Sequence, residues 1–517
     1  MKMSVNRDSL QSLMDEKRNK TMILNIGDIF TLQERETKKW FTFQIIRLKG
    51  NDTSYNTVYA DLDYWSDRKP VANDLAGMQV LYLNHHSWYN KVSMCWAEGC
   101  RFPLKAEFVG NVPVLYDGEC SKYGDWPDGI QQKETEKWKM IPTDQVAAYQ
   151  QADCQWGRFS MVAGKGYPIG LCSVNDEILD LINDYEELNK LPRLNRVVTT
   201  RYRPLLIPFL ERRWLIRELV WEHCGQPVLD VRYTHIETLE VNDSDVEEIY
   251  LPQDIRKVTL RGKLSPDLRI YSHNDGYSLA LIVELQKDYL PNVGLPNLKD
   301  LILRNITGVD LTNVPAFYPH LIRLGLIGNP GIIHNVSSIK QLKDLERLVI
   351  HDLFGYSSVD FPLPVDLPNL QSLWLESIPA EVGRAIKRSY TYKIQDMSIT
   401  KQRSHEWLQE NMNNPLRHWD GKEAIPKSQY SKAVTLWKDA RRKITEAAKE
   451  PDTFSNSILS IASDYIEGFN KIDNGLHFIE TEEREDIYNA FESLLDEMKM
   501  SVNRDSLHSL MDEKRKW

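Results

Sequence analysis

The stretch LKDLILRNI, residues 298–306, contains the pattern that decides the fold of this 517-residue chain. The pattern, Leu-x-x-Leu-x-Leu or a close variant of it, returns in LIRLGLIGN (321–329), LERLVIHDL (345–353) and LQSLWLESI (370–378). The first leucines, at positions 298, 321, 345 and 370, are 23, 24 and 25 residues apart. Alternating apolar residues indicate a strand with one buried face, and the regular period indicates a repeat made of one strand and a return segment. Such a repeat cannot bury its apolar face alone, so the copies are expected to stack.

These four copies resemble the units of leucine-rich-repeat proteins, and the resemblance implies a curved solenoid of a kind that usually binds other proteins. Two further segments fit the same template, Ile236-x-x-Leu239-x-Val241 and Ile255-x-x-Val258-x-Leu260. Leu279 to Leu285 lies where another strand is needed. We therefore expect a leucine-rich-repeat array over residues 227–380.

In each copy the leucines are expected to point into the core, and the alternate residues outward onto the inner, concave sheet. The outward positions are Asp300, Ile302, Arg304, Arg323, Gly325, Ile327, Arg347, Val349, His351, Ser372, Trp374 and Glu376. A tryptophan among arginines is typical of protein interfaces. The predicted partner-binding residues of this concave array face are Asp300, Arg304, Arg323, Arg347, His351, Trp374 and Glu376. The alternative is that Trp374 is covered by the domain that follows.

Composition limits the classes of partner. The net charge of −10 and pI near 5.7 give no surplus of Lys and Arg, so no nucleic-acid partner is expected. The sequence has no long apolar run that could span a membrane, and its first 20 residues lack the apolar core of a signal peptide. All six cysteines lie in the first 224 residues without a Cys-x-x-Cys pair, which favours reduced thiols and a cytoplasmic location.

The two ends of the chain repeat each other. Residues 1–18, MKMSVNRDSLQSLMDEKR, recur at 498–515 with His508 in place of Gln11 as the single difference. One interpretation is a paired helix at each end. The interpretation favoured here is genetic: if the natural start is Met22, residues 1–21 are a tail-like segment derived from an upstream tandem copy of the gene.

Residues 22–142 have the pattern of a β-rich domain. Strands are expected at 27–30, 40–48 and 57–62, with turn signals between them. The opening Gly27-Asp28-Ile29-Phe30, followed by a bent sheet and a tryptophan at Trp88 or Trp96, resembles the immunity-protein domains of bacterial polymorphic toxin systems. That resemblance implies a protein that binds and blocks a toxin.

The regions on either side of the array have helical patterns. Residues 143–226 are expected to be a linker and a helical cap, because 196–223 combine arginines with apolar residues at helical spacing. A basic helix of this kind could also meet a membrane surface or an acidic partner. Residues 381–517 are expected to be a helical C-terminal domain. The fold class is therefore multidomain α+β: a β-rich domain, a central leucine-rich-repeat solenoid and a helical domain.

The sequence contains no phosphate-binding Gly-x-x-x-x-Gly-Lys loop, no Gly-x-Ser-x-Gly and no His-Glu-x-x-His. No catalytic residue, cofactor or metal is predicted. His85, His86, Cys95, Cys100 and Cys120 contain zinc-ligand types, but their spacing matches no common zinc module, and buried thiols are the preferred interpretation.

Two hypotheses for function follow. The first is a cytoplasmic, bacterial, antitoxin-like protein, not an enzyme, that neutralises a cognate protein toxin by steric occlusion, with no nucleic-acid or membrane partner. The contact surface is either the array or the β-rich domain. The alternative is an enzyme or enzyme-linked regulator whose active site lies in the N-terminal domain, with residues such as His85, Asp61 and Cys95. A deep polar pocket and a strongly shifted His or carboxylate pKa there would favour it.

Overall fold

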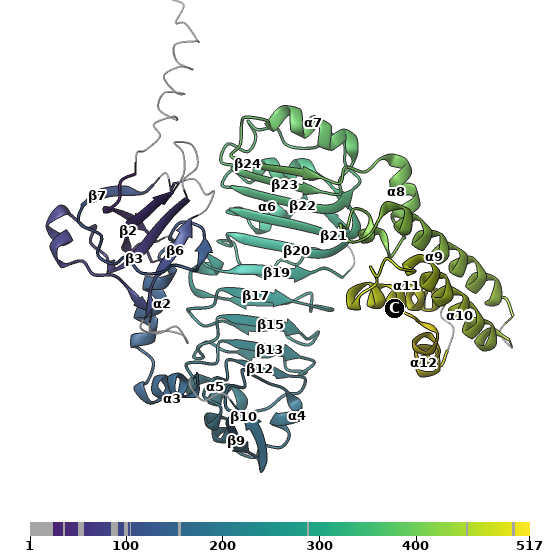
Figure 1. Ribbon diagram of the computed structural model, residues 1–517, viewed down its shortest axis with the longest axis horizontal. Helices are drawn as coiled ribbons and strands as arrows, with labels where there is room; N and C mark the ends of the chain where they lie inside the picture. Colours follow the sequence, from purple (N-terminus) through teal and green to yellow (C-terminus); the bar gives the residue numbers. More distant parts are fainter. Residues whose placement is uncertain are drawn as a thin grey trace, which may run out of the picture. The chain divides into compact units, whose positions relative to one another are not determined.

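A computed structural model describes most of the chain and contains helices and sheets in several parts (Figure 1). The structure describes residues 24–34, 37–49, 56–83, 91–97, 102–103, 105–153, 157–286, 289–450, 453–498 and 502–517. The chain divides into two compact units, unit 1 from Met1 to Ala280 and unit 2 from Leu281 to Trp517. The predicted multidomain α+β class is confirmed.

Unit 1 begins with a six-stranded sheet of order β7-β1-β2-β3-β6-β8. Its strands are β1 (Asp28–Gln33), β2 (Trp40–Lys49), β3 (Asn56–Ser66), β6 (Met94–Ala97), β7 (Glu107–Asn111) and β8 (Tyr123–Gly124). Between β3 and β6 in the sequence, strands β4 (Tyr82–Leu83) and β5 (Lys91–Val92) pair as a small antiparallel hairpin. Both faces of the large sheet are buried: Phe30, Phe43 and Trp126 belong to one core, while Ile29 and Val58 belong to the other. Alternation along β1 and β2 produces these two faces, since neighbouring side chains point to opposite sides.

Helix α2 (Ile130–Lys139) joins this sheet to the parallel strands that follow in unit 1. On one side Gln132 Nε2 donates hydrogen bonds to the carbonyl oxygens of Thr42 (3.3 Å) and Leu62 (3.2 Å). On the other side Glu134 accepts from Arg217 (2.9 Å) and from Arg256. Helix α3 (Thr143–Asp153) and the hairpin β9 (Phe159–Val162) and β10 (Lys165–Pro168) come next.

The remainder of unit 1 consists mainly of parallel strands. One run has the order β11-β12-β13-β15-β17, and a second parallel sheet has the order β14-β16-β18. The strands of the first are β11 (Ser173–Val174), β12 (Arg196–Thr199), β13 (Glu218–Glu222), β15 (Thr238–Asn242) and β17 (Lys257–Leu260). Those of the second are β14 (Val228–Asp230), β16 (Glu248–Tyr250) and β18 (Arg269–Tyr271). The chain therefore alternates between two sheets, as expected for short repeats.

The structure differs from the expected linker and helical cap at 143–226. Strands β12 and β13 already belong to the parallel run, so the array begins before residue 227. Within 196–223, where the cap helix was expected, the helix is the seven-residue α5 (Leu206–Arg212); α4 (Asp176–Leu179) and the longer α3 lie before it. The physical reason is burial: Ile216, Leu219 and Trp221 are all buried, in the same Leu-x-x-Leu-x-Leu spacing. Of the nearby arginines, Arg217 lies between them and the others precede Ile216.

Unit 2 continues with parallel strands of order β20-β21-β22-β23-β24, and β19 (Ala280–Glu284) contains the division between the units. The strands are β20 (Asp300–Asp310), β21 (Arg323–His334), β22 (Arg347–Phe354), β23 (Ser372–Glu376) and β24 (Asp396–Thr400). The three leucine-type positions of each of the four sequence copies are buried. Short segments α6 (Val314–Phe317) and α7 (Ala380–Tyr390) carry the chain between strands. Strand β24 extends the run beyond residue 380, the expected end of the array.

The C-terminal part of unit 2 is helical. Its helices are α8 (His405–Asn411), α9 (Lys427–Ala447), α10 (Phe454–Asp473), α11 (Thr481–Met498) and α12 (Arg504–Lys514). Their shared core contains Trp419, Trp437 and Phe491. The C-terminal copy of the duplicated segment forms α12, and its Leu507 and Met511 are fully buried in that core. The N-terminal copy lies outside the described residues.

Side-chain contacts connect the helices of unit 2 to its strands. Arg403, which follows β24, donates from Nε to Ser377 Oγ (3.0 Å) and forms an ion pair with Asp420. Asp420 also accepts from Trp407 Nε1 at 3.0 Å. Arg417 donates to Asn329 Oδ1 at 3.1 Å, across 88 residues of sequence. Among the described residues, no helix combines the length and apolar character needed to cross a membrane.

Candidate functional site

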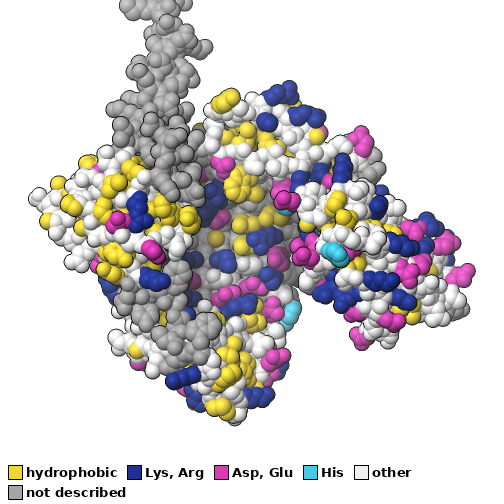
Figure 2. All heavy atoms as spheres, viewed as in Figure 1, with side chains coloured by type: hydrophobic (Ala, Val, Ile, Leu, Met, Phe, Trp, Pro, Cys, Tyr) yellow, Lys and Arg dark blue, Asp and Glu magenta, His cyan; other side chains and the backbone are white. Residues whose placement is uncertain are grey.

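The candidate site is the outward surface of β20–β24, called here the array face. Parallel pairing in register places its side chains in three rows that run across the strands. The first row is Asp300, Arg323, Arg347, Ser372 and Asp396, and the central row is Ile302, Gly325, Val349, Trp374 and Ser398. The last row is Ile327, His351, Glu376 and Thr400; the register of β20 against β21 shifts after Leu303, so Arg304 is not part of it. Figure 2 shows hydrophobic and basic side chains close together over the strands.

Trp374 is the large aromatic side chain of the array face and is 45% exposed. The domain that follows therefore leaves it accessible. Its indole Nε1 donates to Asp396 Oδ2 at 2.5 Å, and the Arg347 guanidinium carbon lies 5.7 Å from its ring centroid. These two contacts hold the ring in one orientation, and an ordered aromatic side chain loses little conformational entropy on binding.

Arg323 and Asp300 form an ion pair of 2.6 Å between adjacent strands in the first row. Burial raises the pKa of the Asp300 carboxyl, although the charges of Arg323 and Arg347 oppose this shift. Arg323 is itself largely exposed. The pair thus presents a guanidinium to solvent over a carboxylate that is mostly covered.

His351 and Glu376 are neighbours in the last row. His351 Nε2 lies 4.0 Å from Glu376 Oε1 and 3.6 Å from Asp352 Oδ2. Lys401 Nζ lies 3.0 Å from the same Glu376 oxygen. Burial raises the pKa of Glu376, but the hydrogen bond from Lys401 and the nearby positive charges outweigh it, so the pKa lies below its ordinary value.

The seven predicted residues do not form one compact cluster. Arg347 and Trp374 are in contact, while Asp300 with Arg323 and His351 with Glu376 form two separate pairs. Arg304 is exposed on β20, three strands from Trp374. Sequence analysis missed Asp396 and Lys401, which belong to β24 and the residue after it. Ile394-x-x-Met397-x-Ile399 is the signal that could have revealed this strand.

The residues of the alternative hypothesis lie in the N-terminal sheet. Asp61 is buried, and burial raises its pKa to about 6 despite a hydrogen bond from Ser93 Oγ (2.6 Å). Burial also raises the pKa of the Cys95 thiol, whereas catalytic cysteines have lowered pKa values. His85 lies outside the described residues. An active site in this domain stays a prediction.

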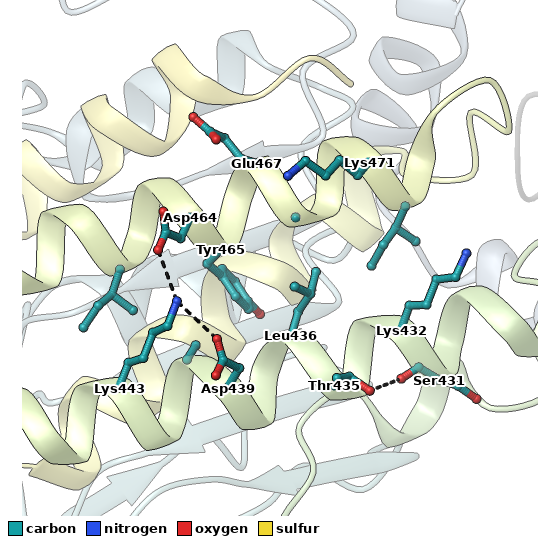
Figure 3. A pocket seen from close by; sticks show the side chains of 14 residues that line it. Ser431, Lys432, Thr435, Leu436, Asp439, Lys443, Asp464, Tyr465, Glu467 and Lys471 are labelled. Atoms are coloured by element: carbon teal, nitrogen blue, oxygen red, sulfur yellow. Dashed lines mark hydrogen bonds and ion pairs between the residues drawn. The ribbon is translucent and has the colours of Figure 1, made fainter.

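Two hollows elsewhere in the described parts of the chain bear on the search for a site. The larger, about 590 Å³, is a groove between α9 and α10 with Leu436 and Ile461 among its apolar lining (Figure 3). There Lys443 bridges Asp439 (3.2 Å) and Asp464 (3.1 Å), so these three charges partly offset one another. The smaller lies between α3 and α5. Neither is lined by residues of the N-terminal sheet, and the described residues contain no cluster of His, Cys, Asp and Glu suited to a metal ion.

The comparisons with known proteins are sparse. No protein-family model matches the sequence, and no curated protein matches it. Among solved structures, an internalin from Listeria monocytogenes is similar with a TM-score of 0.24 and 14% identity, covering 43% of this chain and 72% of the internalin chain. A likeness of this size assigns no function. The comparisons do not support the resemblance to immunity proteins, which stays a prediction.

Proposed function

We propose that the parallel strands form a leucine-rich-repeat solenoid whose array face binds another protein. The observation that carries this proposal is Trp374, an exposed aromatic side chain held in place by Asp396 and Arg347. Tryptophan and arginine dominate the binding energy of protein interfaces, especially where they are ordered before binding.

The proposed partner is a bacterial protein toxin, which this chain would neutralise by covering its active surface. This part of the proposal rests on the sequence pattern of residues 22–142 and on the duplicated segment at the two ends. The chain itself would perform no chemistry, and binding alone would produce the effect. The array face and the N-terminal sheet are the two candidate contact surfaces.

The test is direct measurement of affinity for proteins encoded by genes next to this one, with the full chain and two variants. Trp374→Ala is expected to weaken binding by about 30-fold, since a hot-spot residue contributes roughly 2 kcal/mol. Tyr289→Ala removes another exposed aromatic, outside the strands, and is the matched control with no expected change. Equal affinities for wild type and Trp374→Ala would exclude the array face as the contact surface.

A further inference from the structure

The groove between α9 and α10 is a second candidate surface, because a hollow of about 590 Å³ lies along these two helices (Figure 3). We infer that it binds one amphipathic helix of a partner protein, with the acidic end of that helix over Lys432 and Lys471. The inference is independent of the array face, since none of the residues that line the groove belongs to β20–β24.

The groove has the length of a short helix. Its lining residues run from Ser431 to Lys443 on α9 and from Ile461 to Ile472 on α10. At a rise of about 1.5 Å per residue, each wall is about 18 Å long. The two helices approach closely between these ends, because a Cβ atom on Gly468 would lie 2.6 Å from a carbon of the Leu436 side chain. Helix packing therefore closes the floor, and the hollow is a groove rather than a hole between the helices.

The hydroxyl groups of the lining already have partners. Ser431 Oγ donates to the Lys427 carbonyl oxygen (3.0 Å), and Thr435 Oγ1 donates to the Ser431 carbonyl oxygen (2.9 Å). Tyr465 Oη donates to the Ile487 carbonyl oxygen of α11 at 3.4 Å. Between the charged groups, the rest of the lining includes Leu436, Ala440, Ile461, Gly468 and Ile472. The groove thus offers an apolar surface with few groups that could pair with the backbone of an occupant.

This lining selects the conformation of the occupant. An extended segment would lose the hydrogen bonds between its backbone and water on entering the groove, and the lining could not replace them. An α-helix satisfies its backbone groups internally and can turn one apolar side toward the groove. Large apolar residues at i, i+3 or i+4, and i+7 would then lie along the walls. The expected occupant is therefore an amphipathic helix of about 12 residues.

Charge gives the occupant a direction. At one end of the groove, the two carboxylates that Lys443 bridges exceed its single positive charge. At the other end, the lining contains Lys432 and Lys471 with one carboxylate, Glu467. Among the residues drawn in Figure 3, no ion pair involves either of these two lysines. Acidic residues of the occupant are favoured over the two lysines, and basic residues are favoured over the Lys443 bridge.

The probe is a synthetic, fluorescently labelled helical peptide of about 14 residues, with leucines at i, i+3, i+4 and i+7 and glutamates in one terminal turn. Fluorescence anisotropy with the full chain measures its affinity. A second peptide with glutamines in place of the glutamates is expected to bind about fivefold more weakly. A third peptide with serines in place of the leucines is expected to lose binding altogether, because the apolar contact is gone.

Two threonines of α9 provide a matched pair of variants. Thr435→Glu places a carboxylate in the wall of the groove, and we expect it to weaken the glutamate peptide at least about tenfold. Thr445→Glu is the control with no expected change. Thr445 is also exposed and its hydroxyl also donates to the carbonyl oxygen four residues earlier, but it does not line the groove. Because both positions are exposed, neither change is expected to lower the melting temperature appreciably.

Two lysines of α9 test the direction of the occupant. Lys432→Glu is expected to weaken the glutamate peptide about fivefold and the glutamine peptide much less, because it reverses the charge under the acidic end. Lys438→Glu makes the same change at an exposed position outside the groove and is expected to have no effect. Equal losses for both peptides on Lys432→Glu would overturn the acidic end of the occupant.

The remaining outcomes decide which surface and which occupant are involved. Unchanged affinity of the glutamate peptide for Thr435→Glu would overturn the groove as the binding site. Sedimentation of the wild-type chain alone tests another occupant: a dimer that Thr435→Glu dissociates would place a second copy of this chain in the groove and overturn the partner helix. Trp374→Ala is expected to bind the peptide as wild type does, so a failure of the array face and a failure of the groove are separate results.

Discussion

Asp61 shows at the scale of one residue how burial links charge to pH. Its folded-state pKa of about 6 lies above the ordinary value of 3.8, mainly because burial disfavours the charged form. The folded chain therefore binds a proton more tightly than the unfolded chain between these values. By linkage, the contribution of Asp61 to the free energy of unfolding is most favourable at low pH and declines as the pH rises through about 6.

Asp61→Asn removes this titration. Between about pH 4 and pH 7, the free energy of unfolding of the variant is expected to rise relative to wild type by up to about 3 kcal/mol. Urea unfolding of both proteins across that range measures the difference and cancels the titration of all other groups. A constant difference across the range would show that Asp61 does not titrate there.

At the scale of the element, the glycines of strand β21 differ in how much the stability of the fold depends on them. Gly328→Ala is expected to lower the free energy of unfolding by about 1–3 kcal/mol, because the new Cβ overlaps the Asp352 carbonyl on β22. Gly325→Ala, three residues earlier, is the control and is expected to be neutral or stabilising. Thermal unfolding of the two variants decides the matter, and equal melting temperatures would contradict the packing described for Gly328.

Helix α2 depends on buried charge. Burial raises the pKa of Glu134, but Arg217 and Arg256 outweigh it and the pKa is lowered. Glu134→Gln is expected to cost about 1–3 kcal/mol, since Arg217 and Arg256 lose one of the two carboxylates that they pair with and keep Glu237. Glu136→Gln, on the exposed side of the same helix, is expected to cost less than about 0.5 kcal/mol. If urea unfolding shows similar losses of stability in both variants, the buried ion pairs of Glu134 stabilise the fold no more than the exposed ion pair of Glu136 does.

At the scale of the whole molecule, the duplicated segment offers a comparison within one chain. Leu507→Ala in α12 is expected to cost about 2–5 kcal/mol because this side chain is fully buried. Leu10→Ala makes the identical change in the N-terminal copy. If residues 1–21 are a tail-like segment, that change is expected to leave the unfolding curve unaltered. A comparable loss of stability at Leu10 would favour the paired-helix interpretation.

Sequence periodicity predicted the array core well, because buried leucines repeat along the chain without reference to distant residues. It failed at the array's margins. Ile216-x-x-Leu219-x-Trp221 fits the pattern, but the arginines around it suggested a helix. In addition, a tryptophan occupies the position where the other copies have leucine or isoleucine. Contacts between distant segments could not be predicted either. Arg256 and Glu134 are 122 residues apart, and only the fold brings them together.

The rows of the array face have a consequence for how this surface can change. Strands β21 to β24 each contribute one residue to each row, while separate, buried positions hold the strands together. A substitution at Arg323 or Val349 therefore changes one point of the surface and leaves the leucine core intact. If the array face binds a protein as proposed, substitutions at these positions would alter the bound surface one strand at a time and leave the leucine core in place.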